Sequence, residues 1–250
     1  MFAPVYMTPP STEPIRAHIR AGRLGAICTP RQGNKLQEGW EFCIDNGAFS
    51  GKYVGDEEFL ALLKKLRHLA PWCRFVVAPD VPFNHPGTWQ RSRDMLPRIR
   101  DTGFPAALAA QDLMDLDMWD HDDDYDSLFI AGSDAFKLSK AAAALAAYAG
   151  DLGKWRHMGR VNSRKRYRYA AAIGCDSVDG TYLTNAPDKL LSDVLGWRAD
   201  VEQQEPVDLP QVADICDQSY LVTRFGPARR PPASTASPEP DPSVLQEALF

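Results

Sequence analysis

The sequence lacks several features that would assign it to a specialised class of protein. It has no apolar run of about 18 residues, so no membrane-spanning helix is expected. Its start, MFAPVYMTPPSTEP, lacks the basic segment followed by an apolar segment that a secretory signal needs. The motifs G-x-x-x-x-G-K-S/T and G-x-G-x-x-G are also missing, so neither a nucleoside triphosphate nor a redox dinucleotide is expected as a cofactor.

Cysteine is scarce, and its spacing does not suit a structural role. No two cysteines are close enough for a C-x2-C metal site, and their odd number does not suit a disulfide framework. Cys43, Cys73 and Cys175 lie in apolar, strand-like segments, where cysteine usually acts as a small hydrophobic residue. We therefore expect no disulfide, no cysteine-rich zinc site and a reducing cytosol as the compartment. The cysteines are Cys28, Cys43, Cys73, Cys175 and Cys216.

A large excess of one charge is absent too. The 250 residues include 28 Lys and Arg against 33 Asp and Glu, a formal net charge of −5. The 44% apolar and 24% charged residues are ordinary for a globular protein and exclude collagen, a coiled coil and global disorder. The weak negative charge argues against unspecific coating of nucleic acid, but it allows a local basic groove.

The C-terminal segment differs in composition from the rest of the chain. Six of the sixteen residues from Pro227 to Pro242 are proline, which weakens both helices and sheets. Residues 226–250 are therefore predicted to be a disordered tail, although the last residues, SVLQEALF, could form a short docking helix. Residues 1–225 are then one folded domain.

Within residues 1–225, short apolar runs alternate with helix-prone segments. Eight strands that alternate with helices predict a parallel sheet, and the count and length favour a single-domain (β/α)8 TIM-type barrel of the α/β class. A doubly wound sheet is the alternative. The expected strands are Ala3–Tyr6, Leu24–Cys28, Glu41–Ile44, Arg74–Ala78, Ala106–Ala110, Leu128–Ala131, Trp155–Met158 and Ser177–Val178. Helices are expected over residues 56–69, Gln90–Thr102 (shortened or kinked by Pro97), Ser139–Tyr148 and Arg164–Ile173.

Carboxylates and amides follow several of these strands. Asp45, Asp80 and Asp179 each come directly after β-prone residues, and barrel enzymes build their sites at the C-terminal ends of strands. Asp112 and Asp134 are better explained as turn or helix-capping residues. Two carboxylates on one rim suit chemistry at an acetal-like carbon. The residue types alone allow a glycoside hydrolase, a nucleoside-processing enzyme or a base-exchange enzyme.

Six segments of the chain carry a more specific pattern. They are DNGAF (45–49), APDVP (78–82), QD (111–112), GSDAFK (132–137), HMGRVNSRKR (157–166) and GCDSVDGT (174–181). Together they resemble the tRNA-guanine transglycosylase superfamily over about residues 40–182, and more closely its phage and bacterial branch that inserts 7-deazaguanines into DNA. DNGAF and GCDSVDGT are the most specific. The resemblance implies a TIM barrel in which an aspartate attacks C1′, guanine leaves, and a free 7-deazaguanine of the preQ0 type displaces the enzyme.

The resemblance also implies roles for individual residues. Asp179 would be the nucleophile, with Asp176 as the alternative if the motif is shifted in register, and Asp45 would be the general acid and base. The edge of the base would be contacted by Asp80, Gln111 and the backbone of Gly132 and Ser133. Phe49 would stack on the base, or it would be a core aromatic.

Two departures from the family pattern separate this chain from the tRNA enzymes. Those enzymes carry a C-terminal zinc site of closely spaced cysteines and a histidine, whereas here only Cys216 follows Cys175 and no histidine follows His157. No metal is therefore expected, and DNA is favoured over tRNA as the partner. Asn46 and Ala48 also replace a serine and a glycine of the family motif. The same exchange on tRNA and a non-catalytic nucleic-acid-binding barrel are the alternatives.

Two stretches of charge have opposite signs. Residues 156–168 carry six Arg and Lys, which form either a solvated helix start or a phosphate-binding surface. On the second interpretation Arg160 and Asn162 contact the substrate, and Arg164 and Arg166 hold the nucleic-acid backbone. Residues 112–126 carry eight aspartates without the order of a calcium loop, and we expect an exposed helix and loop that faces away from DNA. His157 is expected to be a packed core residue rather than a catalytic one.

Overall fold

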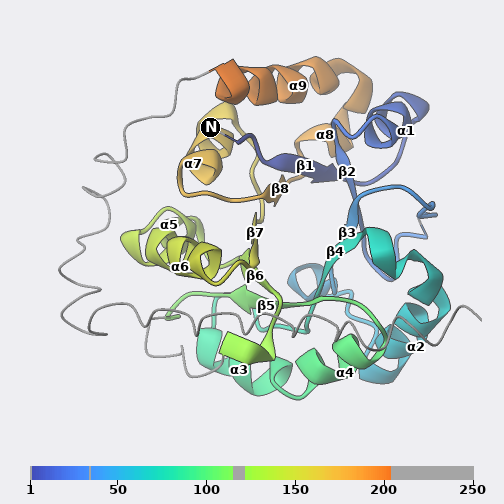
Figure 1. The fold of residues 1–250 in the computed structure, drawn as a ribbon, viewed down its shortest axis with the longest axis vertical. Helices are drawn as coiled ribbons and strands as arrows, with labels where there is room; N and C mark the ends of the chain where they lie inside the picture. The colour runs from blue at the N-terminus through green and yellow to red at the C-terminus, as the bar shows by residue number, and fades with distance from the viewer. Residues whose placement is uncertain (1, 34, 115–121, 204–250) are drawn as a thin grey trace, which may run out of the picture. The chain divides into compact units, whose positions relative to one another are not determined.

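The chain folds into a closed barrel of eight parallel strands. The structure is a computed structural model that describes residues 2–33, 35–114 and 122–203. Each strand pairs with the next, and β8 pairs back with β1, so the ring has no open edge (Figure 1). The predicted (β/α)8 barrel is therefore confirmed, and the doubly wound sheet is excluded because it is open. The strands are β1 (Val5–Thr8), β2 (Gly25–Cys28), β3 (Phe42–Ile44), β4 (Cys73–Val77), β5 (Ala106–Ala110), β6 (Ser127–Ile130), β7 (Trp155–Met158) and β8 (Ser177–Asp179).

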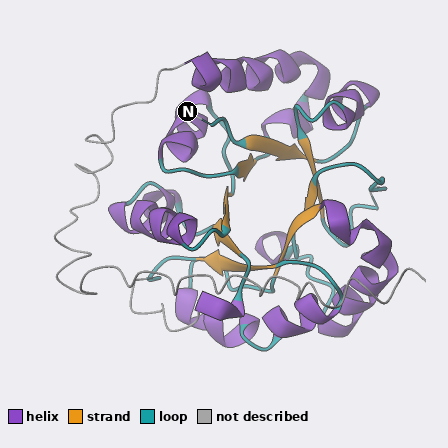
Figure 2. Cartoon of the chain, viewed as in Figure 1, coloured by secondary structure: helices purple, strands orange, loops and turns teal. Residues whose placement is uncertain are grey.

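Helices surround the ring of strands on its outer side (Figure 2). Within the described residues none of them has both the length and the apolar character needed to cross a bilayer. The α-helices are α1 (Glu13–Arg20), α2 (Asp56–Leu66), α3 (His85–Ser92), α4 (Met95–Asp101), α5 (Asp134–Lys137), α6 (Lys140–Asp151), α7 (Arg164–Ala172), α8 (Tyr182–Asn185) and α9 (Pro187–Gln203). Two 3-10 helices, η1 (Ala48–Ser50) and η2 (Arg67–Trp72), lie on either side of α2.

The predicted elements overlap the observed ones with two main differences. The first strand is shifted by two residues, from the predicted Ala3–Tyr6 to Val5–Thr8, because Met7 must pair with both Gly25 and Asp179 to close the ring. The single helix predicted over Gln90–Thr102 is wrong, since two helices, α3 and α4, cover this region. Pro97 lies in the first turn of α4, where its missing N–H needs no partner.

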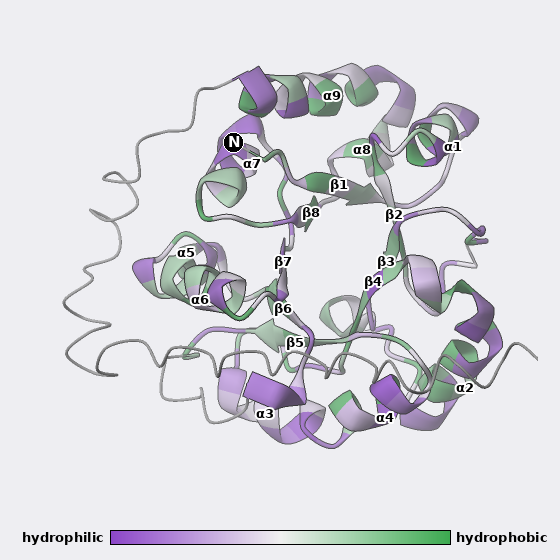
Figure 3. Cartoon of the chain, viewed as in Figure 1, coloured by the Kyte–Doolittle hydropathy of each residue, from purple (hydrophilic) through white to green (hydrophobic). Residues whose placement is uncertain are grey.

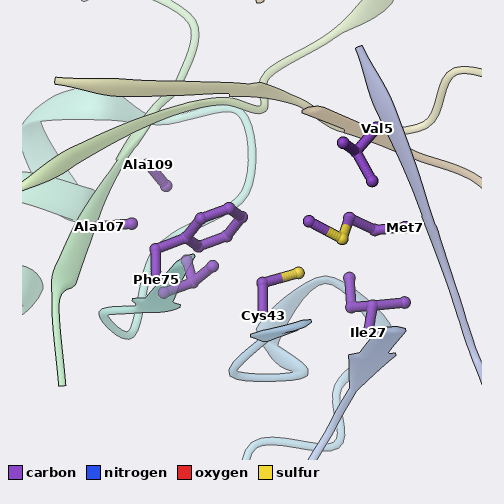
Figure 4. Packing of buried hydrophobic residues seen from close by; sticks show 8 residues of the cluster. Val5, Met7, Ile27, Cys43, Phe75, Ala107 and Ala109 are labelled. Atoms are coloured by element: carbon purple, nitrogen blue, oxygen red, sulfur yellow. The ribbon is translucent and has the colours of Figure 1, made fainter. Parts of the chain in front are cut away.

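The interior of the barrel is filled by side chains from alternate strand positions. Large residues such as Phe75 and Met7 face small ones such as Ala107 and Ala109, so the centre is packed rather than hollow (Figure 4). Cys43 is fully buried in this cluster, as the sequence predicted. The cluster consists of Val5, Met7, Ile27, Cys43, Phe75, Val77, Ala107 and Ala109, with Phe129, Ala131 and Trp155 packed against it.

The last described helix, α9, covers the outside of the barrel where β8 meets β1. Its buried residues, Leu191, Val194, Trp197 and Val201, recur every three or four positions, and apolar and polar residues lie side by side along α9 in Figure 3. The Trp197 ring lies 4.7–6.4 Å, between centroids, from the rings of Tyr6, Tyr167 and Tyr182. Sequence reasoning missed α9. The predicted tail, residues 226–250, lies outside the described residues.

We expect Trp197→Ala to lower the free energy of unfolding by about 3–5 kcal/mol, because it empties a large buried site between α9 and the barrel. Urea denaturation followed by circular dichroism measures this change. The matched control is Lys189→Ala on the exposed side of the same helix, with an expected effect within about 0.5 kcal/mol. Equal stability of the two variants would show that α9 does not secure the barrel.

Candidate active site

The alternation of side chains along the strands selects which residues enter the barrel mouth. Cys43, Ala109 and Ser177 occupy interior positions, and two residues further along the chain come Asp45, Gln111 and Asp179. Because residues two apart in a strand face the same side, these three side chains turn inwards at the C-terminal end of the barrel. Sequence reasoning placed them on this rim, and the structure brings them together there.

Asp45 lies in a partly buried position among other carboxylates. Burial is the largest effect and raises the pKa of Asp45 to about 6, while the Gly47 N–H that Oδ1 accepts at 2.9 Å opposes this rise. The negative charges of Asp179 and Asp80 raise the pKa further. A carboxyl group with this pKa can both give and take a proton near neutral pH.

Asp80 is held by two amide side chains. Its Oδ1 accepts from Asn46 Nδ2 at 2.9 Å and its Oδ2 accepts from Gln111 Nε2 at 2.5 Å. Burial raises the pKa of Asp80, although both amides oppose the rise. Asn46, which replaces a serine of the family motif, also donates to the Ala78 carbonyl at 2.8 Å and so ties the end of β3 to the end of β4.

Gln111 connects three neighbouring loops rather than presenting a free amide. Its Oε1 accepts from Phe83 N at 2.9 Å and from Gly132 N at 2.8 Å. Ser133 N in turn donates to Asp112 Oδ2 at 2.6 Å. The Gly132 and Ser133 backbone was expected to contact a base, and in this structure both of its N–H groups donate to internal acceptors. Asp112 is a turn-stabilising residue, as expected.

Asp179 ends β8 with one carboxylate oxygen anchored. Its Oδ1 accepts from the backbone N–H of Arg160 at 3.0 Å and lies 3.3 Å from His157 Nε2. The Asp179 side chain is 19% exposed, so it remains reachable from the barrel mouth. His157 is fully buried, as the sequence predicted, but its ring contacts the site directly.

Asp176 lies at the other end of the same strand. It precedes β8, and its carboxylate accepts from Arg156 Nε and Nη2, both at 3.0 Å, and from the Arg156 backbone N–H at 2.8 Å. Asp176 therefore does not join Asp45 and Asp179, because a three-residue strand separates the two ends of the barrel. The structure assigns Asp176 to a surface ion pair.

Arg160 extends across the barrel mouth and stacks on two exposed aromatic rings. Its guanidinium carbon lies 4.6 Å from the ring centroid of Phe49 and 5.6 Å from that of Phe83, and Nη2 donates to the Gly132 carbonyl. Phe49 and Phe83 are 56% and 48% exposed, so the expectation that Phe49 is a core aromatic is wrong. A planar cation against aromatic faces is a stable arrangement, and a flat base fits the same kind of surface.

Among the described residues, three that are not glycine adopt left-handed backbone conformations, and all three follow barrel strands. Phe83, Leu113 and Arg160 have φ values of 65°, 71° and 59°. Such positions cost about 1–3 kcal/mol each and are often found at binding sites. No sequence signal predicted them, because glycine, the usual residue at positive φ, is absent from these positions.

The four residues predicted to contact nucleic acid have different surroundings. Asn162 Oδ1 accepts from Tyr182 N at 3.0 Å, and Arg166 pairs with Asp134 and donates to the Arg160 carbonyl. Both therefore hold the loop after β7 in place. Arg164 pairs with Asp200 at 2.7 Å and, with Lys165 and Arg168, lines a surface cavity of about 450 Å³ on α7.

Apart from Asp112, the described part of the aspartate-rich segment lies away from the site. Asp126 immediately precedes β6, at the N-terminal end of the barrel, and pairs with Arg100 at 2.8 Å. Asp122 accepts from the Tyr148 hydroxyl at 2.7 Å. Asp115, Asp117 and Asp120 lie outside the described residues. Across residues 2–33, 35–114 and 122–203, no three His, Cys, Asp or Glu side chains are grouped to hold a metal ion.

Comparison with known proteins supports the fold. No family model and no curated protein matches the chain. A mandelate oxidase variant with benzaldehyde is 12% identical over 86% of this chain and 75% of its own, with a TM-score of 0.52. Mandelate oxidase with 3,3-difluoro-2-hydroxy-3-phenylpropionic acid is 13% identical over the same shares, with a TM-score of 0.51. The tryptophan synthase complex of Pyrococcus furiosus matches at 14% identity, 81% and 98% coverage and a TM-score of 0.48. At these identities the similarity to the two mandelate oxidase structures shows the barrel fold alone.

We expect Asp45→Asn to stabilise the protein at neutral pH and not at acid pH. The pKa of Asp45 rises from an ordinary 3.8 to about 6 on folding, so folding takes up a proton between these values. Above pH 6 the folded state carries an unfavourable charge, and removing it should raise the free energy of unfolding by up to about 3 kcal/mol. The gain should disappear below about pH 4 in urea titrations at several pH values.

The control for this prediction is Asp112→Asn. Burial raises the pKa of Asp112, but hydrogen bonds from Ser133 outweigh burial and hold this pKa below its ordinary value. The Asp112 carboxylate therefore stabilises the fold at neutral pH, and its replacement should lower the free energy of unfolding there, with the loss shrinking as the pH falls. The same pH dependence for both variants would contradict the environment described for Asp45.

Proposed function

We propose that the protein is a DNA guanine transglycosylase, a pentosyltransferase that exchanges guanine in DNA for a 7-deazaguanine of the preQ0 type. The proposal rests mainly on one observation: Asp45, Asp80 and Asp179 lie together at the C-terminal ends of β3, β4 and β8. Burial and the neighbouring carboxylates raise the pKa of Asp45 to about 6. The Asp179 carboxylate is held by hydrogen bonds, and the neighbouring Asp45 can exchange a proton. Such a pair suits the breaking and forming of a glycosidic bond. The resemblance of the six sequence segments supports the same chemistry.

The exchange is balanced in atoms and electrons. Asp179 Oδ2 attacks C1′ of the deoxyguanosine, the C1′–N9 bond breaks, and its electron pair leaves with guanine, which takes a proton from Asp45. The pyrrole nitrogen of the incoming base then gives its proton back to Asp45 and attacks C1′. The bond between C1′ and Asp179 breaks, and the carboxylate is restored. No oxidant or reductant is needed, and no cofactor is invoked.

The base would lie between the carboxylates and the aromatic rim. Asp80, fixed by Asn46 and Gln111, would accept hydrogen bonds from the N–H groups of the guanine edge. Phe49 would stack on its face, in the place that the Arg160 guanidinium takes in this structure. The base would displace Arg160 from the Gly132 carbonyl and release its charge to contact a phosphate.

DNA is the proposed polymer because the sequence departs from the zinc-bearing tRNA branch. A base within a duplex cannot reach Asp179, so the target nucleotide must be flipped out or single-stranded. Arg164, Lys165 and Arg168 on α7 offer positive charge for phosphates, although the ion pair with Asp200 limits Arg164. Binding through such contacts should weaken steeply as salt rises.

We expect purified protein to incorporate radiolabelled guanine into DNA, and we expect Asp179→Asn to abolish both incorporation and any covalent adduct with DNA. Asp45→Asn should slow incorporation about 10²–10⁴-fold, the usual contribution of a general acid or base. Scintillation counting of precipitated DNA and mass spectrometry of a trapped adduct are the measurements.

Asp176→Asn is the matched control, since it removes a carboxylate from the same motif at the opposite end of β8. This variant should still incorporate label at the wild-type rate once it is folded. Label that enters only tRNA would overturn the DNA assignment. Absence of label from both polymers with folded wild-type protein would overturn the proposed function.

A further inference from the structure

We propose that His157 is a positioning residue that sets which oxygen of Asp179 attacks, and that Ser177 and Trp155 fix its tautomer. The inference rests on the proposed function in taking Asp179 as the nucleophile. Its basis is a continuous chain of hydrogen bonds in the barrel interior. Trp155 Nε1 donates to Ser177 Oγ at 2.8 Å, Ser177 Oγ lies 2.8 Å from His157 Nδ1, and His157 Nε2 lies 3.3 Å from Asp179 Oδ1.

The packing around His157 leaves its ring little freedom to turn. The ring lies 4.9 Å, between centroids, from Phe75 and from Phe129, and neither His157 nor Ser177 is exposed to solvent. Water cannot replace either partner of the imidazole in such a site, so its two nitrogens depend on Ser177 and Asp179. Both nitrogens of the buried ring have such a partner.

The chemistry of the partners selects one tautomer. A carboxylate can only accept, so His157 Nε2 must carry the hydrogen that Asp179 Oδ1 receives. Neutral imidazole then has a bare Nδ1, and the Ser177 hydroxyl can donate to it. The Trp155 indole N–H can only donate, and it takes a lone pair of Ser177 Oγ, which leaves the hydroxyl hydrogen for His157. Every group in the chain has a compatible role in this arrangement.

The result is an asymmetric carboxylate. Within the described residues, every hydrogen bond to the Asp179 side chain ends on Oδ1, from His157 and from the Arg160 backbone. Two donors hold the negative charge of Oδ1 and fix the plane of the carboxylate, so Oδ2 is the oxygen free to attack C1′. Gly159 leaves room for Asp179 Oδ1 in this position, because a Cβ atom at residue 159 would lie 2.9 Å from Phe129 and 3.3 Å from Asp179 Oδ1.

The kinetic test compares His157→Leu with His157→Gln in the guanine incorporation assay. Leucine keeps the apolar packing and removes the donor, so kcat should fall about 10- to 100-fold while KM for DNA stays unchanged. Glutamine offers an amide N–H near the position of Nε2 and should restore most of kcat. Equal kcat for wild type and His157→Leu, or equal losses in both variants, would overturn the positioning role.

The spectroscopic test uses wild-type protein with ¹⁵N-labelled histidine. The signals of His157 are assigned by their loss in His157→Gln, and the expected state is a protonated Nε2 and a bare Nδ1. In Ser177→Ala the bare-Nδ1 signal should shift, because its donor is removed. A protonated Nδ1 in the wild type would overturn the proposal. This test does not depend on base exchange, so wild-type protein without incorporation would contradict the proposed function alone.

Discussion

The closure of the barrel is the constraint on which the site depends. Parallel pairing of β8 with β1 completes the ring, and alternation along each strand then decides whether a side chain enters the barrel or faces the helices. The next interior positions beyond the apolar core, two residues further along their strands, are occupied by Asp45, Gln111 and Asp179. A shift of one residue in any of these strands would move its polar side chain from the mouth of the barrel to the outside.

Carboxylates that lie together at one barrel mouth repel one another, and the chain offsets this repulsion with hydrogen-bond donors. Asp80 receives the amides of Asn46 and Gln111, and Asp179 receives a backbone N–H and an imidazole. These donors fix the direction of each carboxylate, and the charges of Asp179 and Asp80 still raise the pKa of Asp45. The Arg160 guanidinium stacks on Phe49 and Phe83 and so lies across the barrel mouth beside these carboxylates.

Much of this arrangement could be predicted from the sequence, for a physical reason. Apolar runs short enough to be strands end directly at Asp45, Asp80 and Asp179, and parallel strands place such residues on one rim. The choice between Asp179 and Asp176 stayed open in the sequence, and the structure separates them, since only Asp179, at the C-terminal end of β8, lies on this rim. Asn162 and Arg166 could not be judged in this way, because their partners Tyr182 and Asp134 lie 20 and 32 residues away. The polar contacts of His157 were equally hidden, because a buried histidine gives the same sequence pattern with or without polar neighbours.

Asp45 and Asp179 differ in their hydrogen-bond donors and in their surroundings. Burial and the charges of Asp179 and Asp80 raise the pKa of Asp45 to about 6 and so favour its protonated form. Only the backbone N–H of Gly47 opposes this rise. Asp179 has two donors on one oxygen, the backbone N–H of Arg160 and His157 Nε2, and these fix the orientation of its carboxyl group. Under the proposed function, two aspartates of identical chemistry would thus be directed to different tasks by their surroundings, as acid–base pairs in enzymes commonly are. Under the proposed function, moving the hydrogen-bond donors from one aspartate to the other, with both aspartates in place, would therefore exchange the roles of Asp45 and Asp179.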